Sequence, residues 1–121
     1  MEKEFVKYET AVALKELGLD EASFGHYRTY GKNLFYATPI ARNLPARYRV
    51  INAPLYQQAF RWFREKHKLH STITSISQES WQWHITKPGE SLGKLYNEDF
   101  YTYEEAESAC LDKLIEICKN K

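Results

Sequence analysis

The chain has 121 residues, the usual length of one domain, and we expect a single domain over residues 1–121. Hydrophobic residues make up 43% of it and aromatic residues 15%, which is enough apolar surface to fold and excludes an intrinsically disordered protein. The net charge of +1 argues against sequence-independent binding to duplex DNA, which needs many uncompensated phosphate contacts. Because no apolar run has the length of a signal peptide or a membrane span, we expect a cytoplasmic protein.

The first predicted element is a helix over residues 8–17, because apolar residues recur there at intervals of three and four. Gly18 follows as a residue that adopts left-handed backbone at the end of a helix without strain. Residues 24–36 predict a β-hairpin whose turn lies at residues 31–33, since aromatic and β-favouring residues flank a Gly-Lys-Asn sequence. From residue 37 to residue 53 two prolines and the loss of periodicity predict an irregular loop.

A second helix is predicted over residues 55–67, with Asn52 as its N-cap and Pro54 in its first turn. The helix is amphipathic, because its polar and apolar side chains separate at about 100° per residue. Its polar side carries Gln57, Arg61, Arg64 and Lys68. Its apolar side carries Leu55, Tyr56, Ala59, Phe60, Trp62 and Phe63.

Residues 71–86 predict a second hairpin, followed by a turn at residues 87–90. Trp81, Trp83 and Ile85 alternate with polar residues, which is typical of a half-buried strand. The two tryptophans either belong to the core, which the pattern favours, or form a platform on which a ligand stacks.

The last predicted helix starts after Thr102, which together with Glu105 fits a capping box. Acidic residues crowd its first turns and lysines its end, as the helix dipole favours. The element order is therefore helix–hairpin–helix–hairpin–helix. We expect an α+β fold in which the helices cover one face of an antiparallel sheet.

Charge is strongly segregated along the chain. Residues 1–21 carry three lysines and six acidic residues, residues 22–78 carry nine basic residues and one acidic residue, and residues 79–121 carry five lysines and nine acidic residues. All six arginines lie in the middle segment, interleaved with tyrosines. One interpretation is that the basic middle segment packs against the acidic ends of the chain.

The other interpretation is a binding surface. Arginine grips phosphate through a planar fork, and aromatic faces stack on bases, so this mixture is typical of nucleotide and single-stranded nucleic-acid sites. Loop arginines favour this interpretation, because long irregular loops often carry function. The candidate ligand-binding residues are Arg42, Arg47, Arg49, Arg61, Arg64, Tyr27, Tyr48 and Tyr56.

The sequence contains no recognisable catalytic residues, and we expect neither an enzyme nor a cofactor. Cys110 and Cys118 lie eight residues apart on the apolar side of the last helix, so they predict reduced core thiols rather than a disulfide or a nucleophile. His67 and His70 are close in sequence, but no further ligands complete a zinc site, and we expect no bound metal.

Three stretches of the chain, residues 8–18, 53–66 and 102–117, resemble a widespread family of small proteins of Bacteroidota and their phages and prophages. They include Ala53-Pro54-Leu55-Tyr56-Gln57-Gln58-Ala59-Phe60-Arg61-Trp62-Phe63-Arg64-Glu65-Lys66. The resemblance supplies no functional residues. It implies a small accessory protein of a mobile element, of the kind that sequesters a signalling nucleotide or blocks a host protein.

Two functions follow as hypotheses. The first is a non-enzymatic module that binds a phosphate-bearing ligand, either a nucleotide signal or a nucleic acid, on the arginine- and tyrosine-rich surface. The alternative is a protein-binding inhibitor or adaptor whose basic surface docks an acidic patch on a host protein. The segregated charge also predicts a homo-oligomer held by complementary surfaces.

Overall fold

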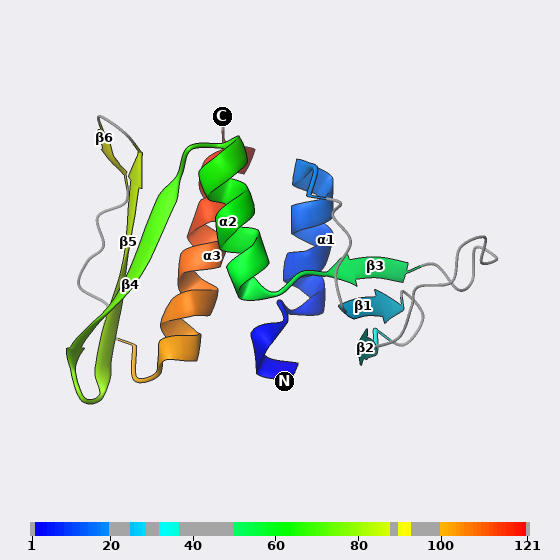
Figure 1. Cartoon of the computed structure of the whole chain (residues 1–121), viewed down its shortest axis with the longest axis horizontal. Coiled ribbons are helices and arrows are strands. Elements are labelled where there is room, and N and C mark those ends of the chain that lie inside the picture. Colours follow the sequence, from blue (N-terminus) through cyan, green and yellow to red (C-terminus); the bar gives the residue numbers. More distant parts are fainter. Residues whose placement is uncertain are drawn as a thin grey trace. The chain divides into compact units, whose positions relative to one another are not determined.

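The computed structural model describes residues 2–19, 25–28, 32–36, 50–87, 90–92 and 100–120. These residues form an α+β structure with two separate antiparallel sheets, ordered β2-β1-β3 and β4-β5-β6 (Figure 1). The elements in chain order are the 3-10 helix η1 (Glu2–Glu4), α1 (Tyr8–Leu17), β1 (Gly25–Arg28), β2 (Leu34–Tyr36), β3 (Val50–Ala53), α2 (Tyr56–Lys66), β4 (His70–Ser77), β5 (Ser80–Lys87), β6 (Glu90–Leu92) and α3 (Tyr103–Lys119).

The chain divides into two compact units, residues 1–58 and residues 59–121. The division falls within α2, whose first residues belong to the first unit and whose remainder belongs to the second. Each unit has its own sheet and its own buried side chains, and each is described by itself below.

In the first unit, α1 packs against β3, and β1 is the central strand of the sheet. The segment before α1 is fastened at two points: the Val6 amide donates to the Pro54 carbonyl oxygen at 3.0 Å, and Phe5 forms an isolated bridge with Leu55. The helix ends as predicted, because Gly18 has φ 108° and the Leu19 amide donates to the Leu14 carbonyl oxygen at 2.9 Å. The helix bounds predicted over residues 8–17 are confirmed.

The first hairpin is also confirmed, since β1 and β2 are antiparallel neighbours, with Lys32 in the turn at a positive φ of 54°. The predicted loop is wrong at its end, because residues 50–53 form β3 and pair with β1. Asn52 is therefore not an N-cap: it lies opposite His26 in that ladder. Pro54 precedes α2 instead of lying in its first turn.

In the second unit, α3 packs against β5 and β4. The long hairpin of β4 and β5 pairs Ser71 with Ile85, Ile73 with Trp83 and Ser75 with Trp81, which places these six residues on one face. That face is turned to α3, because the rings of Trp81 and Tyr103 meet edge to face at 5.4 Å.

The predicted turn at residues 87–90 leads into a further strand, since Lys87 pairs with Glu90 and Ile85 with Leu92. The sequence predicted one sheet made of two hairpins, and this is wrong: each hairpin gains a third strand in a sheet of its own. Both added strands have only a few residues, too few for a period of two to stand out from a loop.

The start of α3 is confirmed, because the Thr102 side-chain oxygen accepts a hydrogen bond of 3.1 Å from the Glu105 amide. Cys110, Leu111 and Leu114 lie fully buried along the helix. In the part of the chain that the structure describes, no helix is both long enough and apolar enough to cross a membrane.

Candidate functional site

Helix α2 presents the candidate site on the side opposite its buried residues. Trp62 is 5% exposed and Phe63 is fully buried, and their rings meet edge to face at 5.0 Å. The His67 ring lies 4.9 Å from the ring of Trp62 and 5.8 Å from that of Phe63. This aromatic cluster fixes the rotation of α2 about its axis, and therefore the direction in which its polar side chains point.

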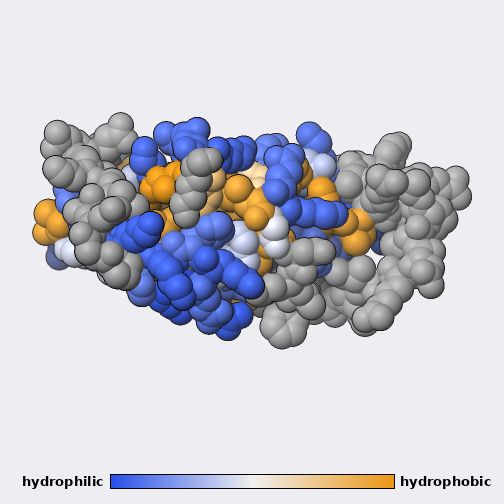
Figure 2. Space-filling model, turned by 90° about the horizontal axis from the view of Figure 1, so that it is seen from above, coloured by the Kyte–Doolittle hydropathy of each residue, from blue (hydrophilic) through white to orange (hydrophobic). Residues whose placement is uncertain are grey.

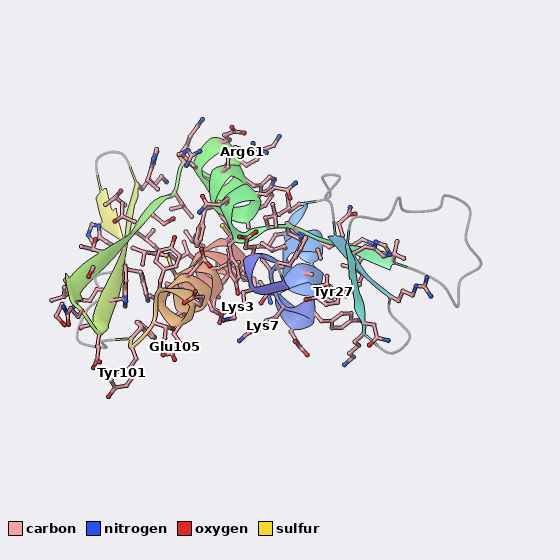
Figure 3. The ribbon with its side chains drawn as sticks, turned by 60° about the horizontal axis from the view of Figure 1, so that its bottom comes forward. Lys3, Lys7, Tyr27, Arg61, Tyr101 and Glu105 are labelled. Carbon is pink, nitrogen blue, oxygen red and sulfur yellow. The ribbon has the colours of Figure 1, made fainter. Side chains whose placement is uncertain are left out.

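Two cations on the polar side of α2 and one that follows the helix are exposed, and we call Arg61, Arg64 and Lys68 the basic stripe. Arg61 and Arg64, three residues apart within α2, lie on one side of the helix with their Cβ atoms about 5–6 Å apart. Lys68 lies two residues past the end of α2 with left-handed backbone, so helical spacing does not place it. In Figure 3 Arg61 lies on the side of α2 turned away from α3. The polar side of the helix predicted from sequence is thus confirmed.

The C-terminal end of α2 is held by its own backbone and by Lys68. The amides of His67 and Leu69 both donate to the Phe63 carbonyl oxygen, at 3.0 and 3.2 Å. Lys68 lies between them at a positive φ of 58°, and its ammonium group donates to the Glu65 carbonyl oxygen at 3.3 Å. Lys68 therefore already neutralises part of the negative end of the helix, and the two arginines are the candidate anion-binding groups of the stripe.

Two more charged residues, Glu65 and Lys66, are exposed in the last turn of α2. Glu65 comes four residues after Arg61, so it lies on the same side of the helix as the stripe. Lys66 is two residues after Arg64, about 200° around the helix, so it points away from the stripe. The described surface turned to the viewer in Figure 2 is mostly hydrophilic, with smaller hydrophobic areas between the charged groups.

The candidate residues from the sequence divide into three groups. Arg61 and Arg64 are brought together on α2, whereas Arg42, Arg47, Arg49 and Tyr48 lie outside the described residues. Tyr27 and Tyr56 are 8% and 7% exposed, and their burial assigns both of them to the core. We therefore leave these two tyrosines out of the binding surface. The sequence pattern places Lys68 on the polar side of the second helix, but Lys68 is not among the candidate ligand-binding residues predicted from sequence.

A second group of polar side chains lies between α3 and β4. Burial raises the pKa of the Cys110 thiol to about 12, although a hydrogen bond with Ser71 opposes the shift. Burial and the neighbouring Glu107 raise the pKa of the Tyr103 hydroxyl. Glu107 itself is only 6% exposed, which is unusual for an acidic residue in the first turns of a helix. The thiol and the hydroxyl both remain protonated at neutral pH, and this group adds no cation or nucleophile to the stripe.

The remaining sequence candidates are placed as follows. Neither Cys110 nor Cys118 forms a disulfide with a described residue, and Cys110 is buried as expected whereas Cys118 is only half-buried. Among the residues that the structure describes, no three histidine, cysteine or acidic side chains lie close enough to hold a metal ion. Trp81 packs on Tyr103, which favours the core over the stacking platform for this tryptophan.

Neither a protein-family model, nor a curated protein, nor a solved structure matches the chain. The resemblance to small proteins of Bacteroidota and their phages therefore stays a prediction.

Proposed function

We propose that the chain is a non-enzymatic binding module that holds a phosphate-bearing ligand, a nucleotide or a single-stranded nucleic acid, on the basic stripe of α2. One observation carries the proposal: Arg61 and Arg64 are exposed one turn apart on a helix whose other side is fixed by buried aromatic residues.

Guanidinium groups suit this ligand class because each presents a planar fork that donates two parallel hydrogen bonds to phosphate oxygens. Two forks one turn apart reach oxygens of a single phosphate or of two adjacent phosphates. Because the aromatic cluster already orients the helix, ligand binding orders few backbone atoms, and the ordering cost within the protein falls mainly on the arginine side chains.

The main competing explanation is that basic residues merely stabilise the helix dipole. That explanation suits Lys68 and the last-turn residues Arg64 and Lys66, since cations are favoured at a helix C-terminus. It does not suit Arg61, which lies in the middle of the helix, more than one turn from its end. A dipole role also explains lysine as well as arginine, whereas both residues of the stripe within the helix are arginines.

The proposed biological role is sequestration of the ligand without conversion. The resemblance to small phage and prophage proteins motivates this role, because an accessory protein that removes a nucleotide signal needs affinity and no catalysis.

The experiment is calorimetric titration of the purified full chain with three probe classes: cyclic nucleotides, NAD-derived nucleotides and a short single-stranded DNA oligonucleotide. We expect one class to bind with an affinity that falls as salt rises. The double variant Arg61→Glu/Arg64→Glu should lose that binding while its circular dichroism spectrum stays unchanged. Absence of heat from all three classes at millimolar ligand contradicts the proposal, as does unchanged affinity in the folded double variant.

A further inference from the structure

The outer edge of β4, in the second sheet, is a surface separate from the basic stripe. β4 is at the end of the order β4-β5-β6, and among the described residues no strand pairs with its outer side. The opposite edge of β5 is covered in two places, by β6 and by Phe100, which exchanges two hydrogen bonds of 2.9 and 3.1 Å with the Trp81 backbone. Within the described residues, one edge of this sheet is thus covered, and no strand covers the other.

The hydrogen bonds of Trp81 reveal which groups of β4 point outward. Since both backbone groups of Trp81 face Phe100, they point away from β4. Backbone direction alternates along a strand, so Gln82, His84 and Thr86 point toward β4 and bond Thr74, Thr72 and His70. The N–H and C=O groups of the alternate residues, Ser71, Ile73 and Ser75, therefore line the outer edge of β4.

The composition of β4 contains none of the usual protection for such an edge. Residues 70–77 read His-Ser-Thr-Ile-Thr-Ser-Ile-Ser, without lysine, arginine, acidic residue or proline. Natural edge strands are normally blunted by charge, proline or a covering segment. Thr72, Thr74 and Ser75 are exposed, and Ile76 is 57% exposed. The strand is rich in β-branched residues, which suits further pairing.

We propose that this edge pairs with the same edge of a second copy of the chain, joining the two sheets antiparallel about a two-fold axis at Ile73. In this register Ile73 faces its own copy, and Ser71 faces Ser75 of the second chain. Each of these pairs exchanges two backbone hydrogen bonds, because all three residues point outward. Every outward-pointing N–H and C=O group from Ser71 to Ser75 then has a hydrogen-bond partner in the second chain.

Charge and side-chain pairing favour a second copy as the occupant. An uncharged strand meets its own copy without repulsion, and Thr72 lies opposite Thr74 of the second chain on the exposed face, a threonine pair that stabilises sheets. The register has a natural end at Ser75, because the ladder with β5 shifts between Ser75 and Ser77. The Ser75 hydroxyl donates to the Ser77 carbonyl oxygen at 2.9 Å in this irregular segment.

The first test is sedimentation velocity of the full chain over a range of concentrations. We expect a reversible dimer that persists at high salt, unlike an association driven by complementary charge. Thr72→Lys/Thr74→Lys places lysines opposite lysines and should raise the dimer dissociation constant about tenfold or more. His84→Lys is the control, because it adds one lysine to the same exposed face but on the inner strand β5, and it should dimerise like the wild type. A wild-type chain that stays monomeric, or a lysine double variant that dimerises normally, overturns the proposal.

The second test determines which residues of the two β4 strands lie opposite each other. In a Cys118→Ser background, chains with Thr72→Cys are mixed with chains with Thr74→Cys. The proposed axis places these two positions directly opposite each other at a Cα separation of about 4.5 Å, close enough for a disulfide. Oxidation should link the mixture much faster than either variant alone, since identical positions are diagonal neighbours. Equal rates in the mixture and in the separate variants contradict the register.

Discussion

The hydroxyl of Tyr27 donates a buried hydrogen bond of 2.6 Å to the carbonyl oxygen of Val6, although the two residues lie 21 positions apart in sequence. The bond ties the central strand of the first sheet, on which Tyr27 is labelled in Figure 3, to the segment that enters α1. The Tyr27 ring also meets Tyr8 edge to face at 5.5 Å, and Lys32 lies 5.1 Å above the Tyr8 ring. Tyr27 is therefore a structural residue of the first unit, in contrast to its role predicted from sequence.

Replacing Tyr27 with Phe tests this role. The variant keeps the ring but leaves the buried Val6 carbonyl oxygen without its donor, so the free energy of unfolding should fall by about 1–2 kcal/mol. Chemical denaturation provides the measurement. Tyr101→Phe is the control, because Tyr101 is 76% exposed and its variant should match the wild type. A Tyr27→Phe protein as stable as the control contradicts the assignment.

Gly25→Ala should destabilise the first unit because of Phe5. A Cβ atom at this position would lie 2.5 Å from Cε1 of the Phe5 ring, which is only 4% exposed and has little room to move. We expect a loss of about 1–3 kcal/mol on denaturation, as for other overpacked cores. Combining the change with Phe5→Leu should cost less than the sum of the two single changes. If the losses of the two single variants add up in the double variant, the Phe5 ring is not what opposes a side chain at position 25.

Gly18→Ala should also destabilise the protein, but through the backbone rather than through packing. Gly18 has φ 108°, and no atom lies within 4 Å of a Cβ built on it. The cost should be about 1 kcal/mol and should be independent of Phe5→Leu in a double-mutant cycle. Coupling between positions 18 and 5 would contradict this distinction.

Thr102→Ala should destabilise α3 by about 1 kcal/mol, because it removes the side-chain oxygen that accepts from the Glu105 amide. Thr102→Ser retains that oxygen and should be close to the wild type. Thermal denaturation of the three proteins side by side provides the comparison. Equal losses in both variants would assign the effect to the lost methyl group instead of the cap.

The free energy of unfolding should fall as the solution is acidified, because His26 becomes protonated. This histidine is 6% exposed on β1, and burial, followed by the neighbouring Arg28, lowers its pKa below the ordinary value of 6.5. Protonation is therefore harder in the folded state than in the unfolded state. The stabilisation is fully present above pH 6.5 and is lost as the pH falls from 6.5 toward the lower folded-state pKa. His26→Gln should flatten the dependence of unfolding free energy on pH in that window, whereas the exposed-site variant His84→Gln should retain it.

The elements with strong periodicity could be predicted from sequence, and those decided by long-range pairing could not. The helix over residues 8–17 and the polar side of α2 follow from residue spacing alone, and Thr102 was visible as a cap. β3 was assigned to a loop because its residues become a strand only through pairing with β1. Asn52 illustrates the failure: a good N-cap residue is held in a ladder opposite His26.

The candidate site was predictable where the helix supplied the geometry. Arg61 and Arg64 are candidates because they belong to the arginine- and tyrosine-rich middle segment, and helical spacing correctly predicts that both lie exposed on the same side of α2. Tyr27 and Tyr56 are candidates because of the stacking ability of their rings, yet both are buried. The burial of Tyr56 agrees with its place on the apolar side of the predicted helix, whereas that of Tyr27 depends on tertiary packing that composition does not encode. Tyrosines that alternate with arginines along the sequence therefore do not necessarily lie on the same surface as those arginines.

The most direct test of phosphate binding by the basic stripe compares two single variants of α2, Arg64→Glu and Lys66→Glu. Both introduce the same charge change on exposed residues in the last turn, so their effects on the helix dipole are matched. Calorimetric titration with the tightest-binding of the three probe classes provides the measurement. We expect Arg64→Glu to weaken binding at least about tenfold and Lys66→Glu to change it by less than about threefold. Equal losses of affinity in the two variants would contradict a site on this side of α2, because they would show that affinity depends only on net charge.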